Sequence, residues 1–355
     1  PRVANNGNLV MEGVPEIPAE IVDSLNRYLN VRSASFQAWS ADVESLFVNT
    51  RFGDVGQLHR VDMPGGARHQ VTFYTEPIGS ASRQPGGSKL TFTRDVGGSE
   101  FAQIFLLDPA GGDASMLTDG ESRNGFVAWD REGRRLAYRS TRRNGASNDI
   151  WIMDPEAPED TRIVLESPDG SLWAPAEFSQ AGTKLLVANY VSITDSRVNL
   201  VDLDTGDVTL LAGGADNPSV NLPVAFDDEN DGFWFVTNRG GEFNVLAWQS
   251  MAEGAEPELV TVDIPWDVKG GTISDDRNRA VFTVNEGGRS AVYLLDPRSR
   301  EYRRVESIPV GLVSGLEFSP NGRQLALTIS TANSPSDSLS LIHISEPTRL
   351  WSGSR

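Results

Sequence analysis

The chain has 355 residues, and 39% of them are hydrophobic, which is enough to fill the core of one large domain or two ordinary ones. Acidic residues outnumber basic residues by 49 to 31, and the formal charge of -18 repels phosphate backbones, so the composition argues against nucleic acid as a partner. No apolar run approaches the roughly 18 residues of a membrane-spanning helix, so we expect no membrane span.

Cysteine is absent, which removes disulfides and thiolate metal sites. This fits a cytoplasmic and a periplasmic location equally well. The first residue is Pro1 rather than Met, so a signal peptide upstream is not excluded and the compartment stays open.

The N-terminal segment, residues 1–33, differs from the rest of the chain. Within it, IPAEIVDSLNRYLN at 17 places Ile21, Leu25, Tyr28 and Leu29 at helical spacing, with Pro18 near the start. The spacing predicts one short amphipathic helix. Its apolar stripe needs a surface to pack against, on the side of this protein or on a second domain.

One sequence unit then recurs: an aromatic or apolar residue, a polar turn, and a short apolar strand. The copies are WSADVESLFV at 39, QPGGSKLTF at 84, WDREGRRLAY at 129, FSQAGTKLLV at 178, FDDENDGFWFV at 226, ISDDRNRAVF at 273 and FSPNGRQLAL at 318. Successive copies are separated by 44 to 49 residues, measured at the first apolar residue after each turn: Leu46, Leu90, Leu136, Leu185, Phe233, Ala280 and Leu325. The spacing is nearly constant.

Two further strands follow each hairpin in most copies. The third is an apolar run that ends at a turn, such as QIFLLDPAGG at 103 or AVYLLDPRSR at 291, and the fourth is shorter, such as DVTLLA at 207. Four antiparallel strands repeated at about 45 residues are typical of propeller blades. We therefore predict an all-β fold, a seven-bladed β-propeller of four-stranded antiparallel blades with an incomplete last blade, preceded by the short helix.

The seventh copy stops early. After ALTIS at 326 the third and fourth strands are expected, but TANSPSD leads into SLSLIHISEPTRLWSGSR. Within this ending, LSLIHISEPTR at 339 resembles the translation of a transposase-end adapter used to prepare sequencing libraries, although a genuine strand LSLIHI is the alternative. We predict that residues 34–337 form the propeller and that residues 338–355 are a non-native tail, which removes His343 and Glu346 as functional candidates.

A family resemblance rests on three segments: NVRSASFQAWSADVESLFVNTRFGDVGQLHRVDMPGG at 30, KLTFTRDVGGSEFAQIFLLD at 89 and RLAYRSTRRNGASNDIWIMD at 135. Together with the helix they resemble the propeller half of bacterial prolyl oligopeptidase family serine peptidases, over about residues 8–337. In that family a propeller of seven or eight blades screens substrates by size for a C-terminal α/β-hydrolase domain, which cleaves short peptides with a Ser-Asp-His triad.

The resemblance implies that this chain is the substrate-gating propeller of such a peptidase, with short peptides as substrates and the hydrolase domain absent. TolB-type propellers share the hairpin repeats, so a stand-alone protein-binding propeller is the alternative. A third class, a propeller enzyme with a metal in its channel, would need Glu, Asn and Asp side chains converging there, and the sequence shows no clear cluster.

The sequence offers no catalytic set. The G-x-S-x-G turn of an α/β-hydrolase is absent, since GGSKL at 86, GGSEF at 97 and GASND at 145 lack the second glycine and lie on predicted turns. His59 and His69 lie in or beside predicted strands of the first blade, where a packing or surface role is favoured over general-base catalysis. We assign no catalytic residue, no cofactor and no metal, and expect the chain alone to be inactive.

DDENDG at 227 starts like a calcium loop, with Asp227, Glu229, Asp231 and Gly232 in order. Its twelfth position is Asn238 instead of a glutamate, and no helix is predicted beside it. A solvated hairpin turn is therefore favoured.

Charged residues recur on the predicted turns between second and third strands, which share one face of a propeller. They are Arg51, Arg94, Arg142, Arg239 and Arg289. One hypothesis is that they form a basic ring that faces the hydrolase domain or steers peptide carboxylates. The alternative, ordinary turn chemistry with solvated arginines, is favoured. Glu100 and Glu242, which follow Gly pairs on two of these turns, are weaker candidates for contact with a substrate amine.

Overall fold

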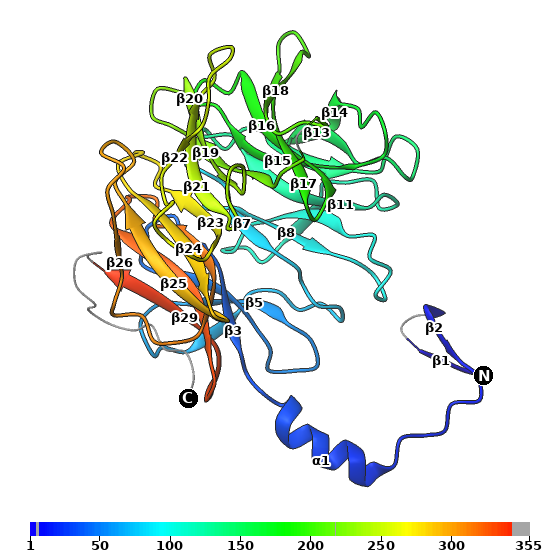
Figure 1. Ribbon diagram of the computed structural model, residues 1–355. Helices are drawn as coiled ribbons and strands as arrows, with labels where there is room; N and C mark the ends of the chain where they lie inside the picture. Colours follow the sequence, from blue (N-terminus) through cyan, green and yellow to red (C-terminus); the bar gives the residue numbers. More distant parts are fainter. Residues whose placement is uncertain (5–6, 217, 343–355) are drawn as a thin grey trace.

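The structure is a computed structural model that describes residues 1–4, 7–216 and 218–342 (Figure 1). Beyond the N-terminal segment, the described strands form seven antiparallel sheets in chain order, six with four strands and one with three. In Figure 1 the sheets succeed one another around a ring. The predicted seven-bladed β-propeller is confirmed.

The first strand of each blade is innermost, and the strands of the first four blades have the following bounds. They are β3 (Ala34–Trp39), β4 (Leu46–Thr50), β5 (Gln57–Val61) and β6 (Arg68–Gln70); β7 (Ala81–Arg83), β8 (Leu90–Arg94), β9 (Gln103–Leu107) and β10 (Ala114–Met116); β11 (Asn124–Trp129), β12 (Leu136–Ser140), β13 (Asp149–Asp154) and β14 (Ala157–Leu165); β15 (Leu172–Phe178), β16 (Lys184–Ser192), β17 (Asp195–Asp202) and β18 (Val208–Ala212).

The remaining three blades contain the following strands. They are β19 (Asn221–Phe226), β20 (Gly232–Thr237), β21 (Val245–Ser250) and β22 (Glu258–Leu259); β23 (Asp267–Ile273), β24 (Ala280–Glu286), β25 (Arg289–Leu295) and β26 (Tyr302–Arg304); and β27 (Leu312–Phe318), β28 (Gln324–Thr331) and β29 (Ser334–Ile342).

Hydrophobic packing between blades holds the ring together, because a sheet that is apolar on both faces must be covered on both. Each of the seven blade interfaces has its own cluster of buried side chains. At the junction of the last and first blades, Phe36 and Trp39 of β3 pack with Ala326 of β28. The Trp39 indole N–H also donates to the backbone oxygen of Glu317 at 3.2 Å. Side-chain packing therefore closes the ring, and no strand of the described chain is exchanged between these two blades.

The seventh blade is incomplete, as predicted, but it has one more strand than the sequence led us to expect. Residues 338–342 belong to β29, which pairs with β28 through Leu327 with Leu339 and Leu325 with Leu341. The expectation that both outer strands are missing was wrong because SLSL alternates with the period of a strand, and Leu339 and Leu341 are buried. The assignment of residues 338–355 as non-native stays a prediction, and His343 and Glu346 lie outside the described residues.

The predicted helix is present as α1 (Ala19–Leu29), and none of its residues is buried. Its apolar stripe is exposed, with 49% of Ile21 and 48% of Leu25 open to solvent. It follows a small hairpin, β1 (Arg2–Ala4) with β2 (Leu9–Met11), which the sequence did not predict. Figure 1 shows α1 and this hairpin projecting away from the blades, so nothing in the described chain covers the stripe.

Candidate functional site

The alternating direction of the strands gives the propeller two distinct faces. The turns between second and third strands lie on the same face as the connections from one blade to the next, and we call this the helix face because the chain reaches β3 there from α1. The turns between first and second strands and between third and fourth strands lie on the opposite face, which we call the far face.

The N-terminal segment is attached to the helix face. The side-chain amide of Asn8 donates to the backbone oxygen of Gly97 at 2.7 Å, and Arg51 donates to the backbone oxygen of Leu29. The Arg32 guanidinium lies 4.9 Å above the ring of Phe52. Gly97, Arg51 and Phe52 all belong to turns between second and third strands, so the N-terminal segment contacts this face at these points.

Each of the five arginines predicted from the turns also lies at the helix face, and each has a local partner. Arg51 binds the Leu29 carbonyl, and the four others form ion pairs: Arg94 with Glu76 at 3.2 Å, Arg142 with Asp119 at 3.7 Å, Arg239 with Glu256 at 2.7 Å and Arg289 with Glu286 at 3.7 Å. The pairing of four of the five with nearby carboxylates argues against a ring of free cations. Whether this set faces another domain stays a prediction.

The two glutamates proposed from the turns are both exposed. Glu100 adopts a left-handed backbone with φ of 64° and lies 3.6 Å from Arg123. Glu242 forms no ion pair within the described part of the chain. The fold does not bring the two glutamates together, because Glu100 belongs to the second blade and Glu242 to the fifth.

The far end of the channel contains a charged group that sequence reasoning missed. Glu177 of β15 accepts a hydrogen bond from the backbone N–H of Phe226 at 2.7 Å and pairs with Arg277 at 2.5 Å. These partners come from the fourth, fifth and sixth blades. Two signals in the sequence point to the pair: Glu177 occupies a repeat position held by Ala38 and Ala225 in other blades, and Arg277 stands where other turns carry Gly133 or Gly182.

Glu317 of β27 occupies the same repeat position as Glu177 and lies near the same end of the channel. Glu317 is partly buried, and desolvation of its carboxyl group, opposed by the charge of Arg83 and reinforced by that of Asp275, raises its pKa to about 7. Such shifts mark functional sites in some proteins and structural charge networks in others. We assign Glu317 no chemistry.

The histidines behave as the sequence suggested. His59 is fully buried in β5, and its Nδ1 lies 2.9 Å from the backbone oxygen of Gln57. Its Nε2 is buried without a partner, and burial lowers the pKa of the ring. His69 is exposed beside Asp62. Ser88, Ser99 and Ser147, the serines of the three glycine-containing segments, lie on turns of the second and third blades.

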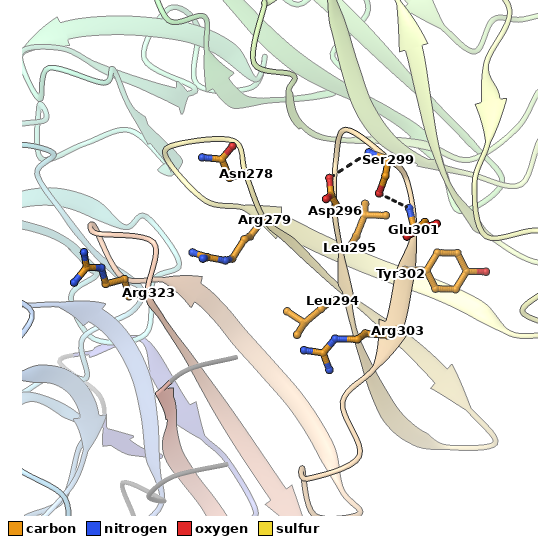
Figure 2. A pocket seen from close by; sticks show the side chains of 10 residues that line it. All are labelled: Asn278, Arg279, Leu294, Leu295, Asp296, Ser299, Glu301, Tyr302, Arg303 and Arg323. Carbon is orange, nitrogen blue, oxygen red and sulfur yellow. Dashed lines mark hydrogen bonds between the residues drawn. The ribbon is translucent and has the colours of Figure 1, made fainter. Parts of the chain in front are cut away.

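A cavity of about 730 Å³ opens on the far face between the sixth and seventh blades (Figure 2). Arg279, Arg303 and Arg323 line it together with Asp296 and Glu301, and Leu294 and Leu295 form an apolar wall. The Ser299 backbone N–H donates to Asp296 at 3.2 Å, so this serine belongs to a local turn.

The loop that begins like a calcium site is a hairpin turn between β19 and β20. The backbone N–H of Asp227 donates to the oxygen of Gly232 at 3.1 Å, which closes the turn. One Asp227 oxygen accepts the indole N–H of Trp248 at 3.1 Å, and burial raises the pKa of this carboxyl. Asp227 is therefore engaged in contacts of the turn itself.

Solved structures with the same fold are prolyl endopeptidases and oligopeptidases. A structure from a study of two prolyl endopeptidases, on inter-domain dynamics in catalysis and specificity, matches with a TM-score of 0.72 and 15% identity over 90% of this chain and 50% of that chain. Prolyl oligopeptidase B from Galerina marginata, as the apo protein, matches with a TM-score of 0.72 and 12% identity over 94% of this chain and 53% of that chain. The same enzyme bound to a 35mer substrate gives a TM-score of 0.69 at 12% identity, over 95% of this chain and 55% of that chain.

At these identities the likeness establishes the fold, and the matched region is the propeller. The chain spans about half the length of the structures that it matches. No protein-family model and no curated protein sequence matches it. Within the described residues, no helix has the length and apolarity needed to cross a bilayer.

Proposed function

We propose that this chain is the substrate-gating propeller of a serine peptidase that hydrolyses short peptides, and that an α/β-hydrolase domain beyond residue 338 performs the chemistry. The observation that carries the proposal is the match of the whole propeller to prolyl oligopeptidases that are about twice as long as this chain. The sequence resemblance over about residues 8–337 points to the same family.

The organisation of the helix face supports a second domain on that side. The chain enters the first blade there, and a fourth strand in the seventh blade would also end there, because it would run antiparallel to β29. A domain joined to the end of the propeller would therefore lie beside the N-terminal segment. The exposed stripe of α1 offers such a domain an apolar surface to cover.

The charged residues of the helix face fit a contact with another domain better than a substrate-steering ring. Arg94, Arg142, Arg239 and Arg289 are already paired with carboxylates, so their net field is weak. Paired charges at the rim of an interface fix how the two surfaces align and which partner binds, more than they increase the affinity. We propose that these residues, with Arg51, Glu100 and Glu242, face the hydrolase domain.

The experiment is to produce the chain together with its native continuation and to assay cleavage of chromogenic dipeptides and of peptides of increasing length. We expect hydrolysis that declines for folded proteins and long peptides, with an active-site serine that reacts with an organophosphate. The chain as given should show neither. A native protein that ends soon after the seventh blade would instead support a stand-alone propeller that binds a protein partner.

A further inference from the structure

Arg139 is an unpaired cation on the helix-face side of the third blade. It lies near the end of β12, opposite Gly125 of β11, and is partly buried. Within the described part of the chain its guanidinium makes no hydrogen bond and no ion pair, and its Nε is buried without an acceptor. A guanidinium has five N–H donors, so an unusual number of donors here have no hydrogen-bond acceptor in the described protein.

A second arginine makes this position more positive. Arg123, in the connection to β11, is close enough to Arg139 that its charge, together with burial, lowers the pKa of the Arg139 guanidinium. In the described chain Arg123 forms one ion pair, with Glu100 at 3.6 Å, and the Glu100 side chain is 80% exposed and therefore screened by water. The protein has a net charge of -18, so this local excess of positive charge is an exception to its overall balance.

Two exposed aromatic rings lie beneath these arginines. The guanidinium carbon of Arg139 is 5.0 Å from the centre of the Phe126 ring, and that of Arg123 is 5.3 Å from the centre of the Phe101 ring. Phe126 is 53% exposed and Phe101 is 43% exposed. The result is a patch, formed by Phe101, Arg123, Phe126 and Arg139, with both apolar and cationic surface open to solvent.

The backbone of Phe126 is strained. Its φ is 52°, in the left-handed region that bulky residues rarely adopt, and it lies at a bulge of β11 between Gly125 and Ala128. Glycine would fit this conformation without cost. Because of this strained backbone the Phe126 ring lies at the surface, where a strand of regular register would not place it. Backbone strain of this kind is concentrated at ligand sites.

We propose that Phe101, Arg123, Phe126 and Arg139 bind the C-terminal carboxylate of a short peptide, with its last side chain against the phenyl rings. A carboxylate offers planar acceptors to the guanidinium groups, which neutral or cationic peptide groups do not. The aromatic faces favour an apolar residue beside that carboxylate. The ligand class rests on the proposed function, whereas the binding itself needs no hydrolase domain.

The test is an NMR titration of the full chain, with the arginine Nε–H signals as the readout. The probes are acetyl-Ala-Phe with a free carboxylate, acetyl-Ala-Phe-amide, and acetyl-Asp-Phe-amide, whose only carboxylate is a side chain. We expect the free acid to bind at least ten-fold more tightly than either amide and to shift the Arg139 signal. Equal binding of the acid and the amide would overturn the site, and tighter binding of the aspartyl peptide would overturn its assignment to the C-terminus.

Variants separate recognition from folding. Arg139→Gln should abolish the preference for the acid, and Arg139→Lys should retain a reduced preference because it keeps charge without the planar fork. Phe126→Gly should weaken binding several-fold while it raises the melting temperature, since it relieves the left-handed strain. Arg298→Gln, at an exposed far-face arginine paired with Asp228, is the matched control and should bind as the parent does. An Arg139→Gln variant that keeps the full preference would contradict the proposal.

The outcomes for the site and for the peptidase function are distinguishable. A hydrolase domain in the native continuation, without a carboxylate preference in the chain, would overturn the site alone. A carboxylate preference in a protein that ends after the seventh blade would overturn the peptidase function alone.

Discussion

Glu177 in the fourth blade and Arg277 in the sixth are joined by an ion pair, with Nη2 of Arg277 2.5 Å from Oε1 of Glu177. The second oxygen of Glu177 accepts the backbone N–H of Phe226 in the fifth blade. One carboxylate therefore connects three consecutive blades at the far end of the channel. Only 8% of the Arg277 side chain is exposed, and its φ of 57° is a left-handed conformation that favours glycine.

Glu177→Ala should be the more damaging change at this pair. It leaves a nearly buried guanidinium and a backbone N–H without partners, at a cost of about 3 kcal/mol in the free energy of unfolding. Arg277→Gly should cost about half as much, because relief of left-handed strain returns about 1 kcal/mol. Urea unfolding of both variants measures these differences, and the double variant should resemble Arg277→Gly. A loss below 1 kcal/mol for Glu177→Ala would show that the pair is not a structural link.

Glu317 should make the protein less stable as pH rises. Its pKa is raised from 4.5 to about 7 in the folded state, so the folded protein holds this proton more tightly than the unfolded chain does. The contribution of Glu317 to stability is therefore greatest below pH 4.5 and is lost as pH rises through 7, by up to about 3 kcal/mol. Glu317→Gln, which stays neutral, should be more stable than the parent at pH 8 and similar to it at pH 4.5. Thermal melts over this range test the sign, and parallel pH profiles for the two proteins would contradict it.

His59 should act in the opposite direction. Burial lowers the pKa of its ring below 6.5 in the folded state, so the unfolded chain binds the proton more readily. Stability should fall as pH drops below about 6.5, because protonation places a cation at a buried site near Arg68. The measurement compares the parent with His59→Gln between pH 5 and 8, in the Glu317→Gln background so that the two titrations do not overlap. A variant with the same acid-side loss as its background would exclude His59 as the cause.

The repeating features of the fold could be predicted from the sequence, whereas features that depend on ring closure could not. The turn residues and apolar strands near Leu46 or Leu325 have a local cause, and so does the spacing of Ile21 and Leu25 on α1. The contact of Glu177 with Arg277 joins residues one hundred positions apart, and only the closed ring brings them together.

Two details had no sequence signal that we could read. Nothing in NGFVAW predicts that Phe126 takes a left-handed backbone, because aromatic residues normally favour a regular strand. The ion pairs of the helix-face arginines were also not predictable, since a partner such as Asp119 for Arg142 lies on a different connection. Charged turn residues can be located from the repeat, but their pairing depends on side-chain geometry.

The uncovered stripe of α1 should cause self-association of the isolated chain. Ile21, Leu25 and Leu29 are each about half exposed or more, and apolar surface on an unattached helix favours contact with other molecules. Ile21→Ser with Leu25→Ser should shift the chain toward monomer in analytical ultracentrifugation without lowering the melting temperature of the propeller. Val208→Ser with Leu210→Ser, at exposed positions of β18, is the control pair, and an equal shift there would argue against a specific role of the helix.

The central claim is that this propeller gates a peptidase domain encoded beyond residue 338, and the native gene sequence past that codon tests it most directly. The account predicts an open reading frame that completes the seventh blade and continues through a domain with G-x-S-x-G followed by an aspartate and a histidine. A stop codon shortly after the seventh blade, or a continuation without that triad, would contradict it.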